Sequence, residues 1–319
     1  MADMKKSMGP LFLSLFICSF LSGQNPLSAG DHFAPINGIQ MHYFVSGKGP
    51  ICLFPSPGWG PSVDMYQRSL SPMEKFFTMV YYDTRISGKS TGPVDSTRYT
   101  MEDFATDMDS LRIYLRQPKV WIMGHSAGGY QVLYYGIHYD NHLNGIVAID
   151  ALVGRDSLYQ AEFTKNIMKR KEQPYFARGA ALFSGKDTTP YKLKDELMII
   201  IPFYFHDTAK IERLAPFVDL NNPYTFSDKA SKYTEISHFQ RFYLFPDLNK
   251  IKVPVLVIVG DDDFICDKTS QADRAVKLIP TSTELIIKDA GHFPWIEQPQ
   301  QFFDQSAEWL TKQNLATHN

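Results

Sequence analysis

A serine lies between two glycines at residues 124–128, in the pattern Gly-x-Ser-x-Gly. A short apolar run at 120–123 precedes the pattern, and a helix-compatible stretch follows it. This order predicts a strand, a sharp turn and a helix, with Ser126 on the strained turn and small glycines letting strand and helix approach. The helix amino terminus favours negative charge beside the hydroxyl. Ser126 is therefore the candidate nucleophile.

A serine hydroxyl becomes a good nucleophile only when a base takes its proton, so a histidine must come from elsewhere in the fold. Of the nine histidines, His292 follows a strand-like run at 284–287, within the segment Asp-Ala-Gly-His-Phe-Pro. A loop there lies at the same sheet edge as Ser126. His125 adjoins the serine, but it points the wrong way from a tight turn. We therefore expect His292 to be the base.

The acid that orients such a histidine belongs at the end of an intervening strand. An apolar run ends at Gly260 and leads into three aspartates at 261–263. We favour Asp263, three residues after the glycine, with Asp262 as the second candidate. Asp150 follows an earlier strand-like run and is a further alternative. The resulting order along the chain is serine, aspartate, histidine.

Negative charge that develops on a carbonyl oxygen requires fixed hydrogen-bond donors. We expect one donor to be the amide of Ala127, directly after the nucleophile. The second should come from the loop at 55–60, which reads Pro-Ser-Pro-Gly-Trp-Gly. Proline has no amide hydrogen, so Ser56 is the first residue of that loop able to donate. The predicted oxyanion hole therefore consists of the amides of Ala127 and Ser56.

These groups predict cleavage of an ester or amide through an acyl-enzyme intermediate, which water activated by His292 then hydrolyses. The aspartate run at 261–263 lacks the spaced oxygen ligands of a calcium loop. We expect neither a metal nor another cofactor.

The elements around these residues alternate between strand and helix, which predicts a doubly wound α/β fold with a mostly parallel sheet. The predicted strands cover residues 39–45, 51–54, 78–82, 120–123, 146–149, 255–259 and 284–287. The predicted helices cover residues 62–76, 101–116, 127–139, 270–278 and 300–312. The alternation stops at 152–245, a charged and aromatic segment that we interpret as an inserted helical cap, with the core at 31–151 and 246–314.

The composition of the chain and its first 23 residues predict where the protein is located and which partners it can bind. The 319 residues are 44% hydrophobic and carry a formal net charge of -2, which offers no basic surplus for nucleic acid. Residues 1–23 have two lysines and then an apolar run too short for a membrane span, as in a bacterial secretory signal peptide. We expect export to the periplasm or medium, no stable membrane span after signal removal, and free buried thiols at Cys52 and Cys266.

Several landmarks together resemble the α/β-hydrolase superfamily, from about residue 36 to residue 310. They are the Pro-Gly loop at 57–58, the Asp-Thr-Arg-Ile-Ser-Gly-Lys-Ser segment at 83–90, the elbow at 124–128 and the Gly-His-x-Pro segment at 291–294. Within the superfamily, the first two are most similar to proline iminopeptidase-like serine peptidases. The elbow Gly-His-Ser-Ala-Gly is shared with esterases and lipases.

This resemblance implies a proline iminopeptidase-like aminopeptidase that acts on a small molecule or short peptide. Such enzymes hold the substrate's free amine with glutamates of the cap, and the cap here offers Glu162, Glu172, Glu196, Glu212 and Glu235. A carboxylesterase or lipase-like hydrolase of small esters is the alternative. A third possibility is a non-catalytic binding protein on the same fold. The serine excludes the nucleophilic aspartate of related dehalogenases and epoxide hydrolases.

Overall fold

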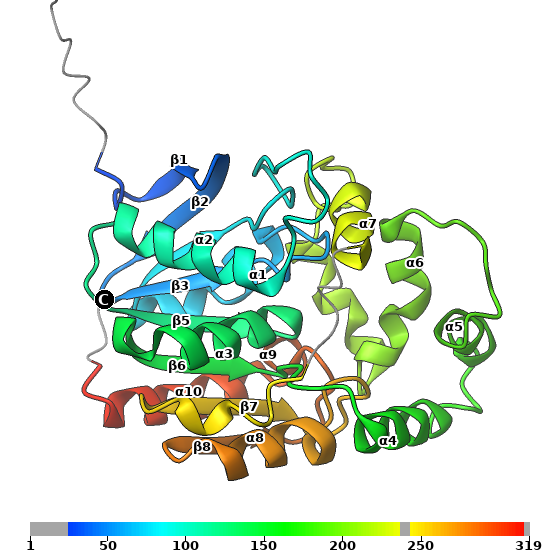
Figure 1. Ribbon diagram of the computed structural model, residues 1–319. Coiled ribbons are helices and arrows are strands. Elements are labelled where there is room, and N and C mark those ends of the chain that lie inside the picture. Colours follow the sequence, from blue (N-terminus) through cyan, green and yellow to red (C-terminus); the bar gives the residue numbers. More distant parts are fainter. Residues whose placement is uncertain (1–24, 237–242, 316–319) are drawn as a thin grey trace, which may run out of the picture.

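A computed structural model describes residues 25–236 and 243–315 of the chain. Its centre is one eight-stranded sheet in the order β1-β2-β4-β3-β5-β6-β7-β8 (Figure 1). The strands are β1 (Gly30–Ile36), β2 (Ile39–Gly47), β3 (Ile51–Pro55), β4 (Thr78–Tyr82), β5 (Val120–His125), β6 (Leu143–Ile149), β7 (Val255–Gly260) and β8 (Ser282–Ile287). β1 and β2 are antiparallel to their neighbours, and all other pairs are parallel. The mostly parallel α/β fold expected from the sequence is confirmed.

The central strands are apolar because both of their faces are covered. Every residue of β5 and of β7 is buried, as is typical of parallel strands between two helical layers. β1, which the sequence analysis missed, alternates instead between exposed and buried residues at the edge of the sheet. A tight Asn37–Gly38 turn with positive φ at both residues joins it to β2.

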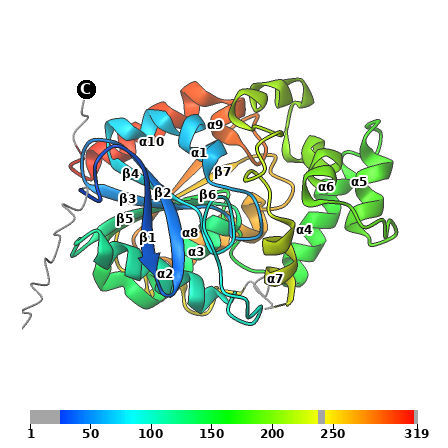
Figure 2. The ribbon, with the colours of Figure 1, turned by 90° about the horizontal axis from the view of Figure 1, so that it is seen from above.

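Helices cover both faces of the sheet (Figure 2). One layer contains α2 (Met101–Tyr114), α3 (Ala127–Tyr139) and α8 (Asp273–Leu278), and the other contains α1 (Asp64–Ser69), α9 (Pro294–Glu297) and α10 (Pro299–Lys312). The predicted helix at 62–76 is the short α1 followed by a 3₁₀ turn at Ser71–Lys75. The predicted helix at 270–278 is α8 preceded by one π-helical turn.

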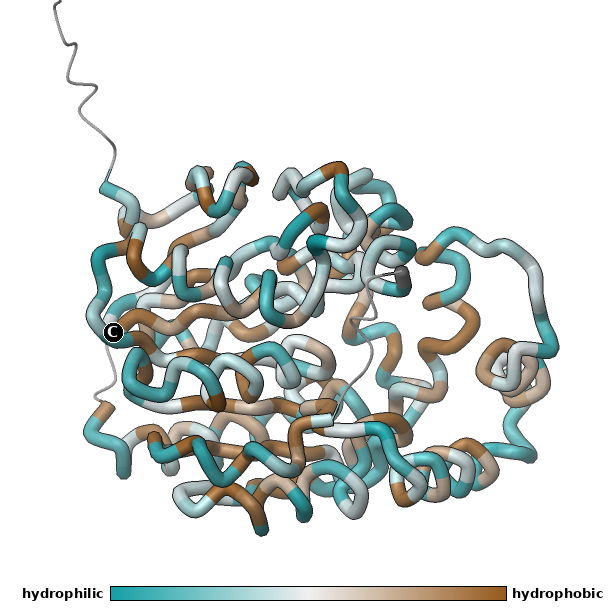
Figure 3. The backbone as a smooth tube through the Cα atoms, viewed as in Figure 1, coloured by the Kyte–Doolittle hydropathy of each residue, from teal (hydrophilic) through white to brown (hydrophobic). Residues whose placement is uncertain are grey.

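The segment between β6 and β7 forms the helical cap. It contains α4 (Ser157–Met168), α5 (Phe176–Phe183), α6 (Leu193–Ile200) and α7 (Asp228–Ile236), joined by loops and short 3₁₀ turns. The cap lies beyond the carboxyl ends of the parallel strands, on the right in Figure 1. Its helices carry apolar residues mixed with polar ones, whereas the sheet is more uniformly apolar (Figure 3). An inserted helical cap was expected from the sequence, and it is confirmed.

The amino-terminal leader predicted at 1–23 lies outside the described residues. Within the part of the chain that the structure describes, no helix combines the length and the apolar character that crossing a bilayer demands. Cys52 and Cys266 are both free and buried, as expected.

Candidate active site

Ser126 lies on the turn between β5 and α3, where its backbone is strained. Its φ of 57° and ψ of -121° are values that non-glycine residues rarely adopt. The turn is fixed by hydrogen bonds from the Ser126 amide to the Ile149 carbonyl (3.0 Å) and from the Tyr130 amide to the Ser126 carbonyl (3.1 Å). A Cβ at Gly124 would lie 2.3 Å from the Gly128 carbonyl oxygen. Strand and helix can therefore meet here only because residue 124 is glycine.

His292 follows β8, and its ring is held by Asp263, which follows β7. The His292 Nδ1 lies 2.7 Å from Asp263 Oδ2, and both side chains are almost fully buried. Because the carboxylate accepts the Nδ1 hydrogen, the Nε2 lone pair is left to accept a proton. Ser126 and His292 both line one pocket, so the structure brings the predicted nucleophile, base and acid together.

The carboxylate of Asp263 is stabilised in its charged form. Burial by itself would raise the pKa of Asp263, and the charge and hydrogen bond of His292 oppose it. The amides of Ile265 and Cys266 also donate to Asp263 Oδ1, at 2.9 and 3.1 Å. Together these groups hold the pKa of Asp263 below its ordinary value. Asp263 therefore supplies the negative charge that stabilises an imidazolium at His292.

The two other acid candidates have different partners. Asp150 accepts the Gly260 amide at 2.8 Å, and burial together with the charge of Asp263 raises the pKa of Asp150 well above its ordinary value. Asp262 accepts a hydrogen bond from Arg170 of the cap at 3.0 Å. Neither carboxyl group makes a hydrogen bond to His292 among the described residues, so the geometry favours Asp263.

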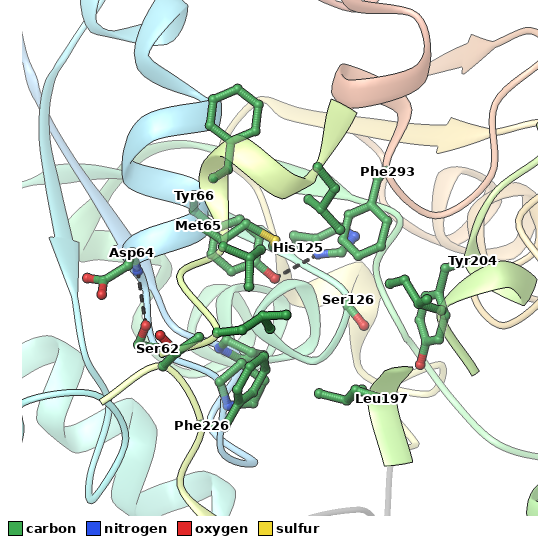
Figure 4. A pocket seen from close by; sticks show the side chains of 18 of the residues that line it. Ser62, Asp64, Met65, Tyr66, His125, Ser126, Leu197, Tyr204, Phe226 and Phe293 are labelled. Atoms are coloured by element: carbon green, nitrogen blue, oxygen red, sulfur yellow. Dashed lines mark hydrogen bonds between the residues drawn. The ribbon is translucent and has the colours of Figure 1, made fainter. Parts of the chain in front are cut away.

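The His125 side chain contacts the loop that carries His292. The sequence analysis did not predict this contact. Its Nε2 lies 2.7 Å from the His292 carbonyl oxygen, and its Nδ1 lies 2.9 Å from the Tyr66 hydroxyl (Figure 4). A carbonyl only accepts, so Nε2 carries the hydrogen and Nδ1 accepts from Tyr66. Burial and the nearby His292 lower the pKa of His125 well below its ordinary value. A neutral histidine therefore fixes the backbone of the candidate base.

Glu297 of α9 is a second residue that the sequence analysis missed. Its buried carboxylate accepts the amides of Gly291 (2.6 Å), His206 (3.1 Å) and Asp207 (3.0 Å). In addition, the His292 amide donates to the Tyr204 carbonyl at 2.7 Å. Residues 204–207 of the cap are thereby joined to the loop that carries His292. The only sequence signal for this role is a glutamate five residues after the histidine.

The structure contradicts the prediction that Ser56 supplies an oxyanion donor. Its amide extends the β3–β4 pairing and donates to the Tyr82 carbonyl at 2.9 Å, so it is not available to a substrate. In the described residues, no acceptor within the chain occupies the amides of Gly58 and Trp59 in the same loop. This loop lies against the elbow, since a Cβ at Gly128 would be 3.5 Å from the Pro55 carbonyl oxygen. Ala127 is the first residue of α3, where an amide has no acceptor within the helix.

The pocket that contains Ser126 and His292 has a volume of about 230 Å³. Figure 4 shows the Ser126 hydroxyl directed toward the side where Leu197 and Tyr204 of the cap lie. The remaining walls come from the loop before α1, from α1 itself and from the 3₁₀ turns of the cap. None of the five cap glutamates considered as amine ligands is among the described residues that line it.

Three potential metal ligands, Asp263, Cys266 and His292, have ligand atoms within 4.8 Å of one another. Two features of the group suit another role. His292 Nδ1 is already paired with Asp263, and burial raises the pKa of the Cys266 thiol well above its ordinary value. A thiol that keeps its proton is a poor metal ligand. The group therefore fits a hydrogen-bonded histidine–aspartate pair beside a neutral thiol better than a metal centre.

Comparisons with known proteins identify the fold family. The family model described as alpha/beta hydrolase fold matches residues 52–299. The chain is 24% identical over 287 residues to a proline iminopeptidase of Lacticaseibacillus rhamnosus, covering 88% of this chain and 97% of that protein. It is 34% identical over 289 residues to a soluble epoxide hydrolase of Corynebacterium sp., covering 88% and 96%. An alpha/beta fold family hydrolase structure from Bacillus anthracis superposes with a TM-score of 0.70 at 16% identity, over 89% and 98% of the two chains.

Proposed function

Because this chain belongs to the alpha/beta hydrolase fold family, we propose that it is a serine hydrolase in which Ser126, His292 and Asp263 act as nucleophile, base and acid. The observation that carries the proposal is the 2.7 Å contact between His292 Nδ1 and Asp263, in a pocket that His292 shares with Ser126. The contact leaves Nε2 free on the side of the pocket. Such a base, oriented by a carboxylate, is what a serine nucleophile requires.

In the first half of the reaction, Ser126 Oγ bonds to the carbonyl carbon of an ester or amide while His292 Nε2 takes the hydroxyl proton. The carbonyl oxygen becomes negative and accepts from the amide of Ala127 and from an amide of the 55–60 loop. The amide of Gly58 or of Trp59 is the second oxyanion donor, in place of the Ser56 amide predicted from the sequence. The bond to the leaving group then breaks, and the alcohol or amine leaves with the proton from His292.

In the second half, water attacks the acyl-Ser126 ester. His292 takes a proton from that water, the carboxylic acid forms, and Ser126 recovers its proton. Asp263 keeps its negative charge throughout and stabilises the imidazolium that forms twice in the cycle. The reaction uses only water and groups of the chain itself.

The test is labelling of the folded protein with a fluorophosphonate probe, read by mass spectrometry of the modified peptide. We expect one adduct, on Ser126, and no adduct in Ser126→Ala. The control variant Ser110→Ala changes a half-buried serine of α2 that does not line the pocket, and it should label like the parent protein. An unlabelled parent protein with an intact thermal transition would favour the non-catalytic binding protein.

An aminopeptidase that releases amino-terminal proline is the second candidate. Its support is the likeness to a proline iminopeptidase over nearly the whole chain. With the five cap glutamates outside the described lining of the pocket, Asp64 or Asp219 would have to hold the free amine. Hydrolysis of proline-β-naphthylamide at a rate comparable to that of simple nitrophenyl esters would favour it. Activity on esters alone would remove it.

A further inference from the structure

The cap side of the pocket is mostly apolar, and Asp219 is its one acidic residue among those described. Among the described residues, no lysine, arginine or glutamate lines it. Apolar side chains of the cap do so, among them Leu197, Met198, Ile201, Ile211, Leu214 and Phe217. Transfer of an alkyl chain from water to such a surface is favourable, whereas a charged group would lose its hydration without gaining a partner.

The two acidic residues of the lining have partners within the chain. Asp64 Oδ2 accepts from the side-chain amide of Asn222 at 3.3 Å, and Asp219 Oδ1 accepts the amide of Asn221 at 2.9 Å. Burial, followed by the charge of Asp83, raises the pKa of Asp64. Each of the two carboxyl groups therefore has one hydrogen-bond donor within the chain.

Size limits the apolar group that fits. A protein cavity of about 150 Å³ holds a six-carbon ring. The pocket volume of about 230 Å³ then corresponds to about nine carbon atoms by proportion. Two lining residues continue the apolar surface outward, because Met198 is 52% exposed and Leu220 is 41% exposed. A chain can therefore enter over an apolar rim.

Resting on the serine hydrolase proposed above, we infer that the substrates are uncharged esters with an apolar acyl group of about six to ten carbons. Esters that end in a carboxylate are disfavoured, because no lysine or arginine among the described residues lines the pocket. The acyl chain would lie against α6 and the 3₁₀ turns of the cap, beyond Ser126.

The first experiment measures kcat/KM for p-nitrophenyl esters with chains of 2, 4, 6, 8, 12 and 16 carbons. Each buried methylene should raise kcat/KM by up to about fourfold. We expect octanoate to exceed acetate at least tenfold, with a decline by 16 carbons. An ester of the same length that ends in a carboxylate should be at least tenfold poorer than its uncharged match. Acetate equal to or better than octanoate would overturn the inference.

Two methionines give a matched pair of variants. Met198 lies at the pocket rim, and Met168 of α4 lies outside the pocket with a similar exposure of 48%. Met198→Glu should lower the ratio of octanoate to acetate kcat/KM at least fivefold, mainly through KM. Met168→Glu should leave both substrates within twofold of the parent. Equal effects of the two variants would show that the rim does not select the chain.

A variant inside the pocket provides a second, independent measurement. Leu197→Trp fills space on the cap side, so the preferred chain should become shorter by two or more carbons. An unchanged preferred length in folded Leu197→Trp would contradict the placement of the chain. Fluorophosphonate labelling separates the two proposals. Labelled protein without a chain preference removes only this inference, whereas unlabelled protein that hydrolyses no ester removes the serine hydrolase as well.

Discussion

Two buried carboxyl groups end neighbouring strands beside the candidate base, and their surroundings shift their pKa values in opposite directions. Asp263 is charged because His292 and two amides outweigh the effect of burial. Asp150 accepts one amide, and burial together with the charge of Asp263 raises its pKa well above the ordinary value.

This difference predicts unequal effects of isosteric substitutions. Asp263→Asn should lower kcat about 10³- to 10⁴-fold with little change in KM, because an amide cannot stabilise the imidazolium. Asp150→Asn keeps an oxygen that can accept from the Gly260 amide and removes no hydrogen bond to His292, so kcat should stay within about threefold. Steady-state kinetics on one nitrophenyl ester measures both. A loss in Asp150→Asn as large as that in Asp263→Asn would reverse the assignment of the acid.

The pentapeptide pattern alone does not single out Ser126, because residues 88–92 also read Gly-x-Ser-x-Gly. Ser90 is buried, and its hydroxyl donates to the Asp83 carbonyl and accepts the His42 amide. The strand before Ser126 and the helix after it made the sequence prediction specific. Asp263 could not be separated from Asp262 in the same way, because adjacent residues share every sequence signal and only the side-chain contacts distinguish them.

At the scale of elements, the cap is fastened to the loops that carry the candidate acid and base. Arg170, just after α4, donates to both the side chain and the carbonyl oxygen of Asp262. Residues 204–207 are held by Glu297 and by the His292 amide. The same contacts therefore hold both the cap walls of the pocket and the loops that carry the reacting groups. A change in the cap that shifts these supports will alter both substrate fit and the position of His292.

Loss of the contact between Arg170 and Asp262 should measurably lower the free energy of unfolding. Arg170→Met keeps the apolar stem but removes two hydrogen bonds to a partly buried carboxylate residue, so unfolding should become easier by about 1–3 kcal/mol. Lys165→Met within α4 removes only a surface ion pair with Glu162, and its effect should be below about 0.5 kcal/mol. Urea unfolding of both variants at pH 7 provides the comparison. Indistinguishable midpoints would mean that the Arg170 contact does not hold the cap.

Most elements of the core follow from local signals, and the exceptions have physical reasons. Buried parallel strands are continuous apolar runs, so β5 and β7 are evident in the sequence. β1 is held by pairing with β2 and contains glycine, aspartate and proline, which seldom form strands. Ser56 was chosen as a donor because the sequence does not show where strand pairing ends, and the β3–β4 pairing takes its amide. The contacts of Glu297 and His125 depend on tertiary packing.

At the scale of the whole molecule, a buried charge network ties the edge of the sheet to the loops near the pocket. His42 of β2 lies 2.8 Å from Asp83 and 2.7 Å from Asp31. Asp83 also accepts the amides of Val63, before α1, and of Lys89. Burial of His42 opposes its charge, but the hydrogen bond and charge of Asp83 outweigh burial and raise the pKa of His42. Protonated His42 therefore stabilises the native state.

The sign of this shift predicts how stability depends on pH. A histidine whose pKa is raised on folding contributes fully below its unfolded value of about 6.5, and the contribution is lost as pH rises through the folded pKa. His42→Gln should therefore lower the free energy of unfolding more at pH 5.5 than at pH 8.5, with a loss of about 1–3 kcal/mol at the acidic end. Urea unfolding at both pH values measures the difference. An equal loss at the two pH values would contradict a charged His42.

Because the backbone at Ser126 is strained, the stability of the protein and its catalytic activity place opposite demands on this residue. A non-glycine residue at a φ of 57° and a ψ of -121° stores about 1–3 kcal/mol that glycine would release. The substitution that relaxes the turn most directly also deletes the hydroxyl. Selection of this chain for heat resistance alone would thus favour inactive descendants, and only simultaneous selection for turnover keeps the serine in place.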